Sequence, residues 1–224
     1  GLGDVYKRQD MAYLSQKARK MLDEAGWPEC QISVSNSLDE RLIQNLFLQG
    51  AQIDMFGVGE RMITAKSEPV FGGVYKLTAV ENDKGEIIPK IKCSENVEKI
   101  TIPHFKKVYR LYNRDNDKAI ADYMTVHDEV VDENEPLMLF DPYATWKTKN
   151  VCNFEARELL VPVFLNGKKV YQSPTLKDIQ AYCKQQVNTL WDEIKRFDNP
   201  QTYYVDLSQK LWDIQQELLR KNRN

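Results

Sequence analysis

Two short segments of this sequence, each following a predicted strand, have residue types that could bind a phosphorylated sugar. Ser35-Asn36 follows a strand predicted at 32–34, and Gly57-Val58-Gly59 follows one predicted at 53–56. A G-x-G turn lets the backbone approach a ligand without a Cβ in the way, and its N–H groups can point at a phosphate. The amide of Asn36 suits a sugar hydroxyl. A plain tight turn at the glycines is the competing interpretation.

Alternating helices and strands must position these two segments. Apolar residues at helical spacing predict a helix over 11–25 and a second helix ending at Leu48, capped by Asn36 or Ser37. The order helix, strand, helix, strand with short links is typical of a parallel sheet or an α/β barrel. Ligands of both architectures bind at the carboxyl ends of strands, which is where both segments lie.

The pattern changes near residues 71–73, after which antiparallel strands and helices are expected. Hairpins are predicted from 74–80 with 86–92 and from 107–112 with 119–125, further strands at 137–140 and 159–164, a turn at 166–167 leading to 170–171, and helices over 175–197 and 206–220. The sequence therefore predicts an α/β fold divided into a barrel-like part over 10–75 and a β-hairpin and helical subdomain over 76–224.

Composition excludes several classes of protein. The 224 residues are 42% hydrophobic and 29% charged, which is typical of a globular chain. The net charge of −2 lacks the basic excess of nucleic-acid-binding proteins. No apolar run approaches the roughly 18 residues of a membrane span, so a soluble protein without a membrane segment is expected. Cys30, Cys93, Cys152 and Cys183 form no C-x-x-C pair, which favours buried or free thiols in a reducing cytoplasm.

Other candidate residues carry weaker signals. His104 and His127 lack metal-ligand spacing, so no metal site is predicted and both are interpreted as surface or loop histidines. The basic strip from Lys106 to Arg114 could contact RNA, although a solvated strand face is the preferred interpretation. Three tryptophans are interpreted as packing residues. They are Trp146, Trp191 and Trp212.

The first nine residues, GLGDVYKRQ, have no initiator Met and no signal-peptide pattern. A helical pattern begins directly after them, at Asp10. We therefore expect residues 1–9 to be a foreign leader and the chain to be truncated, with a frayed natural arm as the alternative.

Long segments resemble nicotinate phosphoribosyltransferases. The signature segment is IDMFGVGERMITAKSEPVFGGVYKL, with further likeness in DMAYLSQKARKMLDEAGW, SNSLDE, KKVYRLY, KAIADYMT, LFDPYATWK, LLVPVFLNGKKVYQSPTLKDIQAYCKQQ and NPQTYYVDLSQKLWDIQQELL. The resemblance covers essentially residues 10–224 and implies that the chain corresponds to the carboxyl-terminal half of an enzyme of that family. It implies an irregular α/β barrel of the type II phosphoribosyltransferase kind, here partial, with a carboxyl-terminal antiparallel β and helical appendage.

The resemblance also implies a reaction. Enzymes of this family join nicotinate to 5-phosphoribosyl-1-pyrophosphate, giving nicotinate mononucleotide and pyrophosphate in NAD salvage. ATP hydrolysis through a phosphohistidine drives the step, and Mg²⁺ helps hold the pyrophosphate. A homodimer with shared active sites is expected. The phosphohistidine is expected in the missing half, so no catalytic residue is assigned in this chain, and the chain alone is expected to be inactive.

Residue by residue, the resemblance assigns substrate-binding positions. Asp10 matches the last acid of the family's R-x-D-S-G-D-L strand end, and Ser35-Asn36 matches the strand end facing the phosphoribosyl group. Gly57-Val58-Gly59 matches the loop that holds the 5′-phosphate. Glu60 stands where the family often has Thr, and a carboxylate there should turn outward and pair with Arg61 or Lys66.

Two alternative functions are kept. A nicotinamide-using phosphoribosyltransferase is a related enzyme, although the S-N-S-L-D-E and F-G-V-G segments look more like the nicotinate family. A non-catalytic assembly module of the same fold would bind the phosphoribosyl ligand without turnover.

Overall fold

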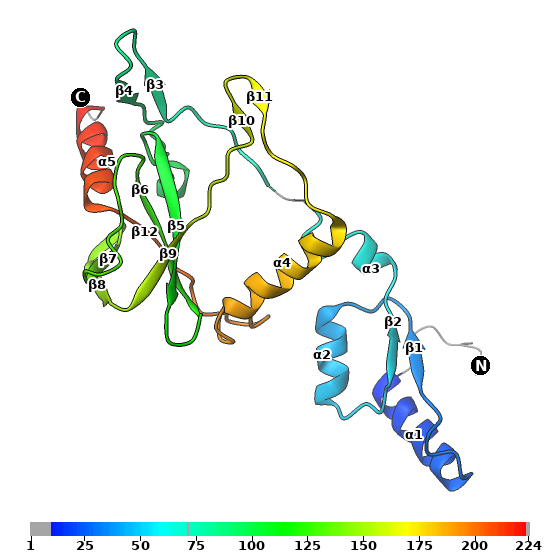
Figure 1. Ribbon diagram of the computed structural model, residues 1–224. Coiled ribbons are helices and arrows are strands. Elements are labelled where there is room, and N and C mark those ends of the chain that lie inside the picture. The colour runs from blue at the N-terminus through cyan, green and yellow to red at the C-terminus, as the bar shows by residue number, and fades with distance from the viewer. Residues whose placement is uncertain (1–9, 71, 223–224) are drawn as a thin grey trace. The chain divides into compact units, whose positions relative to one another are not determined.

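The computed structural model describes residues 10–70 and 72–222, and the chain separates into two compact units (Figure 1). Unit 1 ends at Val74 and unit 2 begins at Tyr75. The predicted leader at 1–9 lies outside the described residues. No helix within the described ranges is long and apolar enough to cross a membrane.

Unit 1 alternates helices with strands, as the sequence predicts. Its elements are α1 (Met11–Glu24), β1 (Ser33–Ser35), α2 (Glu40–Leu48), β2 (Met55–Gly57) and α3 (Glu60–Ile63). The two strands pair in parallel, with Val34 opposite Phe56. In the part of unit 1 that is described they form a two-stranded sheet and close no barrel.

Side chains at the helix ends explain where the helices of unit 1 begin. The Asp10 carboxylate accepts a hydrogen bond from the Tyr13 N–H at 3.0 Å and caps α1. Asp39 caps α2 by accepting from the Leu42 N–H at 2.8 Å. The prediction of Asn36 or Ser37 as the cap of α2 is therefore wrong. Both of those residues have positive φ, and the chain needs them for the turn out of β1 instead.

A small apolar cluster joins the elements of unit 1. Ala12, Leu38 and Leu46 are buried at its centre. Partly buried residues from both strands and from the segment after β2 surround them, among them Val34 and Val58. The first turn of α1, the residue before the α2 cap and the predicted phosphate loop therefore share one core.

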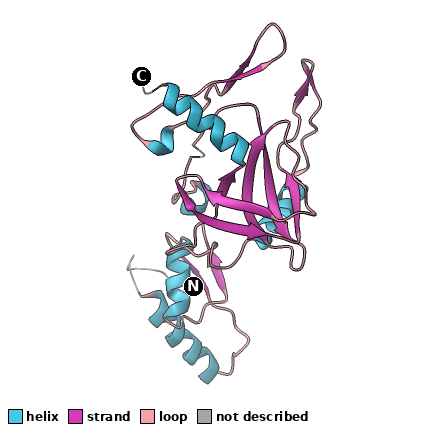
Figure 2. Cartoon of the chain, turned by 90° about the vertical axis from the view of Figure 1, so that its left-hand side faces the viewer, coloured by secondary structure: helices cyan, strands magenta, loops and turns pink. Residues whose placement is uncertain are grey.

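Unit 2 is mainly antiparallel. Its elements are β3 (Ala79–Glu81), β4 (Ile87–Pro89), the 3₁₀ turn η1 (Val97–Lys99), β5 (Lys106–Asn113), β6 (Ala119–Val126), β7 (Leu137–Asp141), β8 (Ala144–Val151), β9 (Phe154–Glu158), β10 (Phe164–Leu165), β11 (Lys168–Lys169), α4 (Leu176–Thr189), β12 (Val205–Leu207) and α5 (Gln209–Lys221). Three hairpins, β3–β4, β7–β8 and β10–β11, accompany a four-stranded sheet of order β12-β6-β5-β9 (Figure 2). The α/β fold class with an antiparallel and helical carboxyl-terminal part is confirmed.

The two faces of the four-stranded sheet differ. One face carries Leu111, Tyr123 and Phe154, which are buried together with Leu139 and Val151 from the β7–β8 hairpin. The hairpin therefore supplies the second layer of the main core, and Leu111 and Phe154 are both 0% exposed.

The other face of the sheet carries a polar network. Arg110 and Asp122, which are opposite one another on β5 and β6, form a bidentate ion pair. Arg110 Nε donates to Asp122 Oδ1 at 2.8 Å, and Nη2 donates to Oδ2 at 3.0 Å. The Tyr203 hydroxyl donates to the same carboxylate at 2.9 Å. The hydrogen bond from Arg110 to Asp122 raises the pKa of the guanidinium, and burial raises the pKa of Tyr203.

Several predicted elements in unit 2 are wrong. The strand predicted at 159–164 is absent apart from its last residue, whereas β8 and β9 were missed. The helix predicted over 175–197 ends at Thr189, where Lys118 Nζ donates to the carbonyls of Asn188 and Leu190. Residues 206 and 207, predicted as the start of the last helix, belong instead to β12, which pairs in parallel with β6.

Individual side chains also depart from expectation. Trp146 is 79% exposed, so its prediction as a packing residue is wrong. The four cysteines are free and exposed, which agrees with the free-thiol alternative rather than the buried one. The basic strip is not a simple solvated face, because Arg110 pairs with Asp122 and the Lys106 ammonium donates to the carbonyls of residues 102–104. Burial lowers the pKa of Lys106 to about 8.

The main core of unit 2 predicts a large cost for truncating Phe154. Phe154→Ala should lower the free energy of unfolding of unit 2 by about 3–5 kcal/mol, since a fully buried aromatic side chain leaves a cavity. Phe164→Ala is the matched control, because Phe164 is 64% exposed and its loss should cost less than about 0.5 kcal/mol. Urea unfolding followed by circular dichroism measures both, and equal midpoints would contradict the assignment of the core.

Candidate functional site

The carboxyl ends of β1 and β2 meet, as the sequence predicts. The parallel register places Ser35 opposite Gly57. A Cβ built on Gly57 would lie 3.0 Å from the Ser35 Cβ and 3.6 Å from the Val34 carbonyl oxygen. The absence of a side chain at Gly57 therefore lets the two strand ends approach one another.

A tight turn leaves β1 directly after Ser35. Asn36 has a φ of 124° and Ser37 a φ of 46°, both in the region that favours glycine. Such backbone conformations cost energy and persist where the surrounding structure imposes them. Here Leu38, which is 1% exposed, anchors the turn in the core, so Asn36 and Ser37 remain on the surface with their polar groups accessible.

Val58 anchors the second segment, whereas its two glycine neighbours stay open. The Val58 side chain packs on the apolar cluster of unit 1. A Cβ on Gly59 would meet no protein atom within 4 Å. Within the described residues, the N–H groups of Val58 and Gly59 donate to no backbone carbonyl. The loop therefore presents two N–H donors without a backbone acceptor in the described part of the chain, beside a residue without a side chain, an arrangement suited to an anion.

An ion pair fixes the two segments relative to one another. Arg61, in α3, pairs with Asp39, the cap of α2. The hydrogen bond from the Leu42 N–H, together with the Arg61 guanidinium, holds the pKa of the Asp39 carboxyl below its usual value. Arg61, one of the two expected partners of Glu60, is therefore engaged elsewhere, and Glu60 itself is exposed at the first position of α3.

Asp10 has a structural contact of its own. Its carboxylate caps α1, and among the described residues it makes no hydrogen bond to Ser35 or Asn36. The structure thus brings together Ser35, Asn36 and the Gly57–Glu60 segment. Asp10 is linked to these segments only through the next two residues, Met11 and Ala12, which pack on the apolar cluster of unit 1.

Sequence reasoning missed the Asp39–Arg61 pair. The signal for Asp39 was present, because an aspartate followed by an apolar-periodic segment is a typical helix cap. The pairing of Asp39 with Arg61 could not be predicted from the sequence, since the two residues are 22 positions apart.

The two histidines of unit 2 belong to no metal site within the described residues. His104 and His127 stack with ring centroids 5.9 Å apart. In the described ranges no group of three or more His, Cys, Asp or Glu side chains is placed to hold a metal ion.

Comparison with known proteins places the antiparallel part of the chain in a defined class. Residues 105–215, which include the four-stranded sheet, match the family model described as the nicotinate phosphoribosyltransferase C-terminal domain. The crystal structure of human nicotinic acid phosphoribosyltransferase has the same fold over 95% of this chain, with a TM-score of 0.67 and 22% identity.

Sequence relatives extend the likeness to unit 1. Nicotinate phosphoribosyltransferase of Bacillus subtilis (strain 168) is 46% identical over 203 residues, 91% of this chain, and the Homo sapiens protein is 28% identical over 209 residues, 90% of it. The chain belongs to the nicotinate phosphoribosyltransferase family. It spans about two fifths of these relatives, 41% and 38% of their lengths.

The Asp39–Arg61 pair predicts a pH-dependent contribution to stability. Asp39→Ala removes both the cap and the charge and should lower the free energy of unfolding of unit 1 by about 1 kcal/mol. Asp39→Asn keeps a good capping residue and removes the charge alone, so its cost at pH 7 should be smaller. Unfolding of the three proteins by urea at pH 7 and pH 3 measures the difference.

The sign of the pH effect follows from the pKa of Asp39. Because the folded-state pKa lies below the unfolded value, the carboxylate stabilises the fold above that unfolded value. This contribution is lost as the pH falls through the folded-state pKa. The gap between wild type and Asp39→Asn should therefore narrow at pH 3, and a gap that widens there would contradict the pairing.

Proposed function

We propose that this chain is part of an enzyme that makes nicotinate mononucleotide and pyrophosphate from nicotinate and 5-phosphoribosyl-1-pyrophosphate. The observation that carries the proposal is the contact between two strand ends, Ser35-Asn36 and Gly57-Val58-Gly59, in a chain that is 46% identical to a nicotinate phosphoribosyltransferase. Strand ends of this kind are where α/β folds bind phosphorylated ligands.

Each residue at the strand ends has a proposed task. The N–H groups of Val58 and Gly59 bind the 5′-phosphate, because Gly59 leaves the approach to them open. The Ser35 hydroxyl and the Asn36 amide bind ribose hydroxyls. These contacts hold the sugar while positive charge develops on its anomeric carbon and pyrophosphate departs, so they act by positioning. Asp10, which the resemblance assigns to the ribose, contributes a negative charge while its carboxylate caps α1.

Mg²⁺ and ATP belong to the proposed reaction, but the described residues contain no three-ligand cluster for a metal ion. Mg²⁺ would therefore arrive with the pyrophosphate group, and no ligand from this chain is assigned to it. Neither His104 nor His127 is assigned the phosphohistidine role, since neither stands in the matching sequence context, and their two rings stack on one another. A homodimer with shared active sites, in the cytoplasm, completes the proposal.

A chimera tests the function. Residues 10–224 would replace the matching region of the Bacillus subtilis protein, and product would be measured with nicotinate, 5-phosphoribosyl-1-pyrophosphate, Mg²⁺ and ATP. We expect nicotinate mononucleotide, and no product when nicotinamide replaces nicotinate. A chimera that melts cooperatively like the Bacillus subtilis protein but uses nicotinamide, or neither base, would overturn the proposal.

Gly59 gives a sharp test of the phosphate site within the chimera. Gly59→Val should raise the KM for 5-phosphoribosyl-1-pyrophosphate about tenfold or more, equivalent to roughly 1.4 kcal/mol, because the new side chain meets ligand rather than protein. The KM for nicotinate should change much less. Gly57→Val is the control for protein damage, since it forces the two strand ends apart and should affect both substrates and the melting temperature. Equal KM changes for both substrates in Gly59→Val would refute the loop assignment.

Glu60 should not face the phosphate. A carboxylate held against the phosphate of the substrate would weaken its binding, so we expect Glu60 to turn outward. Glu60→Thr in the chimera should then alter binding of 5-phosphoribosyl-1-pyrophosphate by less than about twofold. A titration at low and high salt measures this change. A gain beyond about fivefold that shrinks at high salt would show that the carboxylate repels the phosphate.

A further inference from the structure

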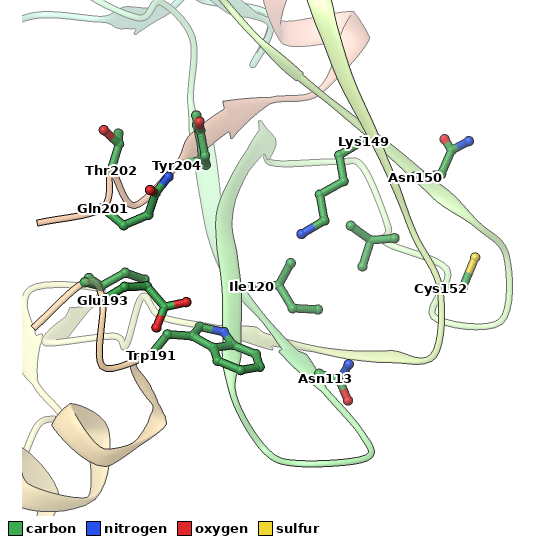
Figure 3. Close-up of a pocket in the computed structure, with 12 residues that line it drawn as sticks. Asn113, Ile120, Lys149, Asn150, Cys152, Trp191, Glu193, Gln201, Thr202 and Tyr204 are labelled. Carbon is green, nitrogen blue, oxygen red and sulfur yellow. The ribbon is translucent and has the colours of Figure 1, made fainter.

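A cleft in unit 2, lined by none of the residues at the strand ends of unit 1, has features of a small-molecule site. Its volume is about 460 Å³, within the range of ligand pockets. Its walls come from β5, β6 and β8 and from the segments on either side of residues 195–200 (Figure 3). The proposed reaction uses none of these residues.

Two opposite charges face one another across this cleft. The Lys149 ammonium points inward from β8, and the Glu193 carboxylate points inward from the opposite wall (Figure 3). Within the described ranges, neither side chain forms an ion pair or a hydrogen bond with another residue. The two charged groups also lie too far apart to form an ion pair with one another. The pair is therefore open, with room between the two groups.

Apolar and aromatic side chains form the body of the cleft. The register of β5 and β6 shifts so that Ala119 and Ala121 have partners on β5 and Ile120 does not. A bulge of this kind turns a side chain away from its regular face, and Ile120 lines the cleft. Trp191 is held at one side, because its indole N–H donates to the Ala119 carbonyl at 3.1 Å. Tyr204, 46% exposed, lies at another side.

The position of Glu193 is fixed by the backbone. Its carbonyl oxygen accepts from the Gln201 N–H at 2.9 Å, which joins the two segments that form this wall. The Asn113 and Gln201 amides add groups that can both donate and accept. The cleft thus combines a fixed aromatic wall, one cation, one anion and neutral polar groups.

We propose that this cleft binds a small zwitterionic molecule with an aromatic body, of which an aromatic α-amino acid is the simplest. The ligand's carboxylate contacts Lys149 and its ammonium contacts Glu193. Its ring lies against Trp191 and Ile120. The charges of Lys149 and Glu193 sum to zero, so a zwitterion matches them. A ligand of high net charge would be repelled by one of these two residues.

Removing each charge of the ligand and of the protein separately tests this pairing. Calorimetric titration of the 224-residue chain uses L-phenylalanine, L-phenylalaninamide, which lacks the carboxylate, and N-acetyl-L-phenylalanine, which lacks the ammonium. Glycyl-L-phenylalanine is a fourth probe with a wider separation of charges. We expect a zwitterionic probe to bind with a Kd below about 10 mM, and both blocked forms to bind about fivefold or more weakly.

Two variants that each remove one charge of the protein complete the test. Lys149→Met should weaken the zwitterion about fivefold and leave phenylalaninamide unchanged, while Glu193→Gln should weaken the zwitterion and leave the N-acetyl form unchanged. Lys147→Met is the matched control, because Lys147 lies on the same strand outside the cleft and should not alter binding. These side chains are at least partly exposed, so the variants should melt like the wild type.

Three results would overturn the proposal. They are the absence of binding by either zwitterionic probe at about 10 mM, equal binding of the blocked and unblocked forms, and zwitterion binding that neither Lys149→Met nor Glu193→Gln changes. None of these results bears on the assignment of the phosphoribosyl site, since that assignment uses none of the residues tested here.

Discussion

Ser35 and Gly57 touch because β1 and β2 run parallel in one register, and the arrangement of unit 1 follows from that contact. A slip of one residue would turn Val34 and Phe56 away from the apolar cluster and move both strand ends. The glycine permits the close approach, and the Asp39–Arg61 pair then holds the helices that follow each strand. Backbone geometry, rather than any single reactive side chain, makes this a place where a phosphorylated sugar could be held.

Much of unit 1 could be predicted because its signals are local. Gly26 and Gly50 both have positive φ at the ends of helices, and the strand–turn segments are short and clearly bounded. The cap of α2 was misplaced because three polar residues, Asn36, Ser37 and Asp39, are equally suitable by type. The core decided between them, since burying Leu38 forces the turn to be completed before Asp39.

The errors in unit 2 have a different cause. In β8, residues 145–150 are exposed without alternation, so no pattern of period two marks the strand. It exists because it pairs with β7, whose Leu139 and Phe140 are buried. The cleft was also not predictable from the sequence, because Lys149 and Glu193 are 44 positions apart and Ile120 reaches the cleft at a bulge between β5 and β6. Long-range pairing outweighs local preference at both places.

β12 lies far along the chain from the strand with which it pairs. This strand joins the edge of the sheet beside β6, although some 80 residues separate the two, and the Tyr203–Asp122 bond and the packing of Leu207 and Leu211 on Val126 hold it there. The covalent path between β9 and β12 runs through residues 159–175, which are largely exposed, and through α4, which has no buried residue. The carboxyl-terminal strand and helix thus depend on noncovalent contacts for their place in the sheet. If the backbone were opened in the exposed stretch, the two pieces would retain complementary surfaces, which makes this stretch a natural point at which to divide the chain for a split-protein reporter.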